Sequence, residues 1–151
     1  MFDHEEMAKV VTEFHLEMGK APSSLTEVRP APDAWSLKEI VGHLVDSAAN
    51  NHHRFVRLQQ GNLKGFPAYD NEAWIEAQHY NDYGWEPLVA LWHLYNQLLL
   101  HVIRTMDEAA FNNEWTVEGK AATLVFLVND YFRHMRDHLT HFRQRLEEVT
   151  G

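Results

Sequence analysis

The sequence predicts an all-α protein, a four-helix bundle with one long connection between its second and third helices. Apolar residues recur at helical spacing along most of the 151 residues, and no segment shows a convincing strand alternation. Residues that cap or end helices flank the periodic segments. The length fits a single domain, residues 1–151, with enough chain to bury a core.

The first helix is predicted to follow Asp3, a good N-cap residue, and to end at Gly19. Its apolar positions have the spacing of one helix face: Met7, Val10, Val11, Phe14 and Met18. Three prolines in residues 20–33 predict an extended connection after this helix.

Ser36 and Glu39 form a capping-box pattern, which predicts a second helix from there to about Gln60. Residues 61–67 are expected to form a loop. Asp70 can cap a short helix over residues 72–78. These segments make up the long connection.

The third long helix is predicted to begin near Glu86 and Pro87, because proline suits a first helical turn. It has a broad apolar face: Leu88, Leu91, Trp92, Tyr95, Leu98, Leu99, Val102, Ile103 and Met106. Residues 111–119 are predicted to be irregular. A fourth helix is expected to start within residues 120–123 and to end near Val149.

Composition excludes several classes of function. A formal net charge of -9 argues against nucleic-acid binding, which depends on clustered Lys and Arg. The absence of cysteine excludes thiolate metal sites, disulfides and cysteine nucleophiles. No segment approaches the ~20 apolar residues of a membrane span, and the first residues are too polar for a signal peptide. We therefore expect a cytoplasmic protein without membrane partners.

The chain contains 11 histidines, and three of them are candidate metal ligands. His134 and His138 lie four residues apart, so their imidazoles project from one helix face. His43 shares a face with Ile40 and Leu44 and should point toward the interior. A buried histidine needs a metal or a hydrogen-bond partner, so His43 is either a ligand or a core histidine bonded to an oxygen.

Three segments of the sequence resemble the DinB/YfiT-like superfamily of bacterial four-helix-bundle metalloproteins. They are WSLKEIVGHLVDS, NNHHRFVR and LVNDYFRHMRDHL, and the resemblance extends over nearly the whole chain. It implies one divalent ion, zinc or nickel, held by His43, His134 and His138. It also implies a homodimer. Many relatives have glutamine where this chain has His141, which we expect to lie near the site or on the surface.

Three neutral ligands leave coordination positions open, which favours catalysis or ligand binding over a purely structural ion. The resemblance implies two reaction classes on a small-molecule substrate. One is transfer to a low-molecular-weight thiol, which we slightly favour; the chain has no cysteine, so the thiol would come from a cosubstrate. The other is hydrolysis by metal-bound hydroxide. A non-catalytic, stress-related metal-binding bundle is the third interpretation. No catalytic residue is assigned.

The residues around the ion can also be predicted. The substrate pocket is expected between the second, third and fourth long helices. Its candidate walls are Trp74, Trp85, Trp92 and Tyr95. Candidates for orienting a ligating imidazole through its second nitrogen are Glu39, Asp46 and Asp130.

Overall fold

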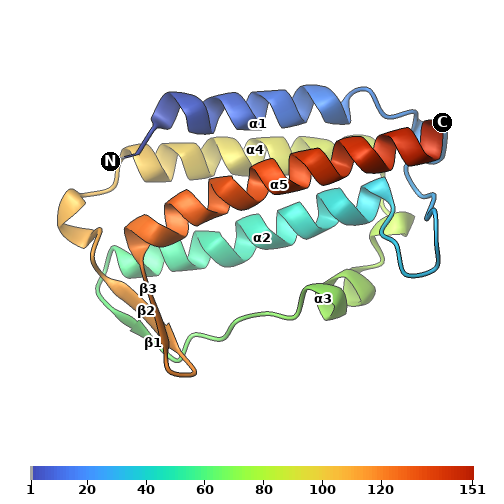
Figure 1. Ribbon diagram of the computed structural model, residues 1–151. Helices are drawn as coiled ribbons and strands as arrows, with labels where there is room; N and C mark the ends of the chain where they lie inside the picture. The colour runs from blue at the N-terminus through green and yellow to red at the C-terminus, as the bar shows by residue number, and fades with distance from the viewer. Residues whose placement is uncertain (1) are drawn as a thin grey trace.

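A computed structural model describes residues 2–151 and shows a bundle of four long helices (Figure 1). These are α1 (His4–Met18), α2 (Leu37–Leu58), α4 (Trp85–Arg104) and α5 (Leu124–Thr150). The short α3 (Asn71–Gln78) lies in the connection between α2 and α4. The predicted bundle and its long connection are therefore confirmed.

Side-chain caps begin the helices where the sequence predicts them. Asp3 Oδ1 accepts from the backbone N–H of Glu6 at 3.0 Å. In the predicted capping box, Ser36 Oγ accepts from Glu39 N at 3.1 Å, and Glu39 Oε1 accepts from Ser36 N at 3.0 Å. Asp70 caps α3 in the same way as Asp3 caps α1. Each cap satisfies N–H groups that have no partner within the helix.

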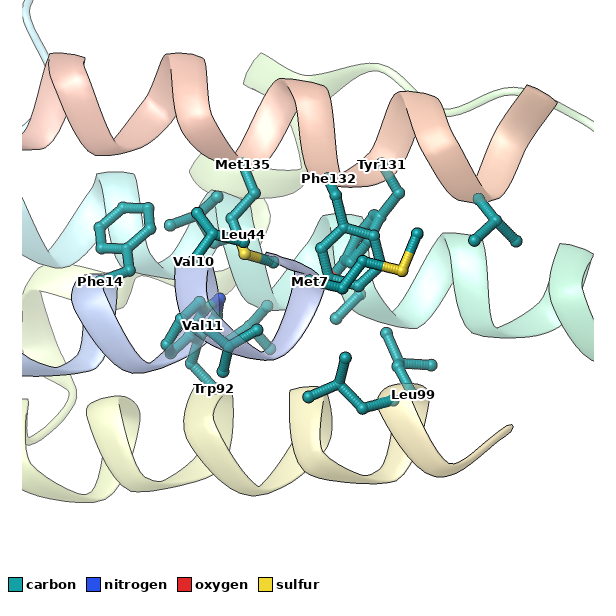
Figure 2. Packing of buried hydrophobic residues seen from close by; sticks show 14 of the residues in the cluster. Met7, Val10, Val11, Phe14, Leu44, Trp92, Leu99, Tyr131, Phe132 and Met135 are labelled. Atoms are coloured by element: carbon teal, nitrogen blue, oxygen red, sulfur yellow. The ribbon is translucent and has the colours of Figure 1, made fainter. Parts of the chain in front are cut away.

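Apolar faces of all four long helices meet in one core (Figure 2). Phe14 of α1 packs against Trp92 of α4 and Phe142 of α5, with ring centroids 5.3 and 5.5 Å away. The predicted face of α4 is too broad, because Leu91 and Leu98 are 44% and 46% exposed. The helix packs mainly against α1 and α2 and contacts α5 through Asn96 and Trp85, so the side that carries Leu91 and Leu98 is left partly exposed.

A small three-stranded sheet corrects the prediction of irregular chain at two places. The strand β1 (Leu63–Lys64) pairs parallel to β2 (Glu114–Val117), which pairs antiparallel to β3 (Lys120–Thr123). Glu118 and Gly119 both have positive φ, 51° and 76°, as a type I′ hairpin turn requires. Residues 120–123 are therefore strand, and α5 begins only at Leu124.

The sheet and α3 lie on the side of α2 away from α1 (Figure 1). The indole N–H of Trp115 in β2 donates to the carbonyl oxygen of Phe66 at 2.8 Å, which ties the sheet to the connection. Among residues 2–151, no helix is both long and apolar enough to cross a membrane.

Candidate metal centre

Two of the three predicted ligands meet between α2 and α5. The Nε2 atoms of His43 and His138 are 3.2 Å apart. His43 is 6% exposed, as its position beside Ile40 and Leu44 predicts. Its other ring nitrogen, Nδ1, is buried without a hydrogen-bond partner among the described residues. Buried polar atoms without partners are uncommon and point to a missing ligand, water or ion.

His134 lies at the rim of the same site. Its side chain is 56% exposed, and its Nδ1 is 3.9 Å from Asp130 Oδ2, beyond hydrogen-bond distance. No three potential His, Asp or Glu ligands converge on one point within residues 2–151. The structure thus brings His43 and His138 together and leaves His134 beside them, one turn away along α5.

The geometry of the buried pair fits a divalent ion. Two imidazole nitrogens bound tetrahedrally to zinc at about 2.0–2.1 Å lie roughly 3.3–3.4 Å apart. The 3.2 Å separation of the Nε2 atoms is close to this value. It equally fits a hydrogen bond in which one ring nitrogen donates and the other accepts. The pair therefore suits a metal without requiring one for the fold.

Burial keeps both histidines in the neutral form that a metal requires. Desolvation, followed by the neighbouring histidines, lowers the pKa of His43 from 6.5 to about 4. The pKa of His138 falls to about 4, mainly by burial and then through His141 and His134. Both imidazoles are therefore uncharged at neutral pH in the metal-free protein.

A stability prediction follows for the metal-free protein. Because these folded-state pKa values lie below the ordinary 6.5, the unfolded chain binds protons that the folded chain does not. We expect the free energy of unfolding to fall as pH drops from about 6.5 to about 4, measured by urea unfolding.

A His43→Gln variant isolates this effect, because glutamine does not titrate. Its stability should vary less over the same pH window. The comparison is needed because burial raises the pKa of Asp46. A raised carboxyl pKa increases the free energy of unfolding as the pH falls, which opposes the effect of the histidines. An equal pH slope in both proteins would contradict the prediction.

A cavity of about 680 Å³ opens beside the histidines. Its walls come from α2, α5, the β2–β3 hairpin and residues 68–71. His43, His134 and His138 all line it. The volume is typical of a small-molecule site. The candidate ligands therefore face a space that can hold a substrate.

The cavity lies at the candidate ligands between the second and fourth long helices, as predicted, but the third long helix does not line it and the predicted aromatic walls are wrong. Its aromatic walls are Trp35, Tyr69, Trp115, Phe126 and Tyr131, and none of the four predicted aromatics lines it. Trp92 is buried in the bundle core, and Tyr95 binds His52 through its hydroxyl at 2.8 Å. Trp74 and Trp85 likewise lie elsewhere. The β2–β3 hairpin and residues 68–71 form the wall that was expected from α4, no residue of which lines the cavity.

Of the three carboxylates predicted to orient a ligand, only Asp130 lies near one. Glu39 caps α2 and binds Arg29, with Nε–Oε1 at 2.8 Å. Asp46 accepts from Tyr80 Oη at 2.6 Å and from Gln78. Glu39 and Asp46 Oδ1 are therefore engaged in structural contacts, while Asp46 Oδ2 is buried without a hydrogen-bond partner among residues 2–151. Asp130 lines the cavity one turn before His134 and also binds Arg133.

His141 lies next to the candidate site without lining its cavity. Its ring centroid is 6.4 Å from that of His138, and its Nε2 is 3.3 Å from Arg145 Nη2. Elsewhere, His15 and His93 stack at 3.8 Å, away from the cavity. His15 and His93 are therefore separate from the buried pair, and His141 lies beside it.

A close contact supports the helix turn that carries His43. The ring of Tyr80 lies against Gly42, where a Cβ atom would overlap it. Tyr80 is 7% exposed, and its hydroxyl donates to Asp46 one turn further along α2. The connection between α2 and α4 thus packs directly on the backbone beside the candidate ligand.

Comparison with known proteins identifies the family. The model of the DinB superfamily matches residues 11–142, most of the chain. The chain belongs to the DinB superfamily. The resemblance seen in its histidine-containing segments is therefore confirmed.

Curated relatives from Bacillus cereus (strain 03BB102) and Bacillus thuringiensis subsp. konkukian are named provisionally as metal-dependent hydrolases. Each is 30% identical over 115 residues, which cover 74% of this chain. The match spans 66% of each relative's length, slightly less than two thirds.

Solved structures share the DinB fold of this chain. YfiT from Bacillus subtilis is described as a probable metal-dependent hydrolase with an unusual four-helix bundle topology. It superposes with a TM-score of 0.83 at 18% identity, covering 99% of this chain and 90% of YfiT. The DinB-like protein YjoA from Bacillus subtilis gives a TM-score of 0.63 at 16% identity, covering 95% and 92%.

Proposed function

We propose that this DinB-superfamily chain binds one divalent ion through His43, His134 and His138 and acts on a small molecule in the adjacent cavity. The observation that carries the proposal is the approach of two neutral imidazoles at one wall of that cavity. His134 completes the set after a side-chain rotation, which an exposed residue makes easily. Zinc or nickel is the expected ion.

The protein would hold the ion and position its partners. When bound, an ion with three neutral ligands supplies open positions and lowers the pKa of a bound water or thiol. Asp130 is placed to orient His134 through Nδ1, or to take a proton from a molecule in the cavity. The aromatic walls Trp35 and Trp115 would exclude bulk water from one side of the substrate.

We place hydrolysis first. The carboxylate of Asp130 in the cavity suits proton removal from a water, and the curated relatives are named as hydrolases. Thiol transfer, which the sequence slightly favoured, is the second candidate. The absence of cysteine means that a thiol must come from a cosubstrate, and about 680 Å³ has room for one.

The two reactions are separated by assays of the zinc- and nickel-loaded protein. Hydrolysis predicts release of nitrophenolate from 4-nitrophenyl acetate without thiol, and loss of this activity after chelation. Thiol transfer predicts that 1-chloro-2,4-dinitrobenzene is consumed only when a thiol such as L-cysteine is added. A non-catalytic ion predicts neither activity, together with a large fall in melting temperature on chelation.

Two further expectations remain predictions. A homodimer requires a solution mass twice the 17.7 kDa of one chain, which sedimentation equilibrium would measure. A cytoplasmic location predicts that the tagged protein fractionates with cytoplasmic markers.

A further inference from the structure

Arg54 is a buried cation without an anionic partner. It is 7% exposed and lines the cavity from α2. Its Nε is buried without a hydrogen-bond partner within residues 2–151. The hydrogen bond found for its guanidinium is a long one, 3.4 Å from Nη1 to Asn51 Oδ1. No carboxylate of the described chain lies within ion-pairing distance of it.

The other buried basic side chains differ from Arg54. Lys38 donates to Glu27 at 2.8 Å. Arg145 binds Glu148 at 3.2 Å and the carbonyl oxygen of Trp35. Burying a charge is costly unless it is paired, and Lys38 and Arg145 obey this rule. Arg54 has, besides the long hydrogen bond to Asn51, the face of Trp115, with Cζ 4.1 Å from the ring centroid.

The position of Arg54 relates it to the candidate metal centre. His43, Ser47, Asn51 and Arg54 lie on one face of α2, and all four line the cavity. His43 and Arg54 are eleven positions apart on α2, which is about 16 Å along the helix axis. The cavity therefore has the histidines toward one end of its α2 wall and an unpaired guanidinium toward the other.

We propose that Arg54 binds an oxyanion group of the substrate, a carboxylate or a phosphate, whose reacting end lies at the histidines. This inference rests on the proposed function and specifies the substrate class. The planar guanidinium donates two parallel N–H bonds to such a group, and the free Nε is one of these donors. The spacing along α2 selects an extended substrate, on the order of 10 Å long.

Octanoate, octyl phosphate and neutral 1-octanol test this proposal, because they share a chain of suitable length. Binding is measured by calorimetry, with metal-free and zinc-loaded protein in a buffer without carboxylate or phosphate. We expect one of the two anions to bind at least about ten-fold more tightly than octanol. The anion that binds more tightly identifies the group as carboxylate or phosphate.

Variants assign the effect to Arg54. Arg54→Gln should weaken anion binding at least about ten-fold and leave octanol binding and zinc binding unchanged. Arg54→Lys keeps the charge and should give an intermediate loss, which serves if the glutamine variant fails to fold. Arg57→Gln is the matched control, since Arg57 is exposed on the same helix and does not line the cavity.

The results distinguish a failure of the Arg54 proposal from a failure of the proposed three-histidine metal site. Equal binding of anions and octanol, or unchanged anion binding in both Arg54 variants, would overturn it and assign Arg54 to packing on Trp115. Anion binding that depends on Arg54 supports it, even if the wild-type protein fails to bind zinc. That last result would overturn the three-histidine proposal alone.

Discussion

Replacing His43 or His138 by alanine is expected to weaken zinc and nickel binding by at least about 100-fold. Loss of a residue that only supports a ligand typically costs 10–100-fold, and loss of a ligand should cost more. Each change removes one of the two nitrogens that already lie 3.2 Å apart. Metal content after dialysis, measured by mass spectrometry, and competition with a chelating dye give the affinity.

His134→Ala should have an effect in the same direction, because the proposal makes His134 the third ligand. His101→Ala is the matched control, since His101 is exposed on α4 and away from the cavity. Folding is checked by the melting temperature of each metal-free variant. Full metal occupancy in a folded His43→Ala or His138→Ala protein would refute the proposed site.

Replacing Gly42 by alanine is expected to destabilise the protein by about 2 kcal/mol or more, because the new Cβ overlaps the Tyr80 ring. This reverses the usual result, since alanine in a helix interior is favoured over glycine by about 1 kcal/mol. The melting temperature should fall by roughly 4–8 °C. Thermal unfolding followed by circular dichroism measures the shift.

A second background tests whether the clash is the cause. In a Tyr80→Ala protein the ring is gone, so adding Gly42→Ala should be neutral or raise stability by up to about 1 kcal/mol. Destabilisation of the same size in both backgrounds would show that the Tyr80 contact is not responsible. The same variants, assayed for metal, report whether this packing also positions His43.

Much of the fold could be predicted because its signals are local. Asp3, Asp70 and the pair Ser36 and Glu39 act on backbone groups within one turn, and each caps a helix as predicted. The three strands were not predicted, because their formation depends on contacts between residues far apart in the sequence. Each has two or four residues, too few for an alternation signal, and β1 pairs with β2 about 50 residues later in the chain.

The candidate site was predicted unevenly for the same reason. The positions of His43 on an inward face and of His134 and His138 one turn apart follow from helix geometry. The cavity walls depend on tertiary packing, so helical spacing gave the wrong aromatic residues. Helical spacing places Arg54 on the same face of α2 as His43, which indicates that it can line the same site. Its burial, which makes the unpaired charge notable, is seen only in the structure.

The candidate ligands and part of the cavity wall belong to different elements of the fold. The candidate ligands belong to α2 and α5, while residues 117–122 at and around the hairpin turn form part of the cavity wall. Changes in the length of the turn, or in Lys120 and Ala121, are therefore expected to reshape the cavity wall while the helices keep their packing. If the proposed function holds, exchange of the hairpin would alter which molecules fit the cavity and leave the candidate ligands on α2 and α5 in place.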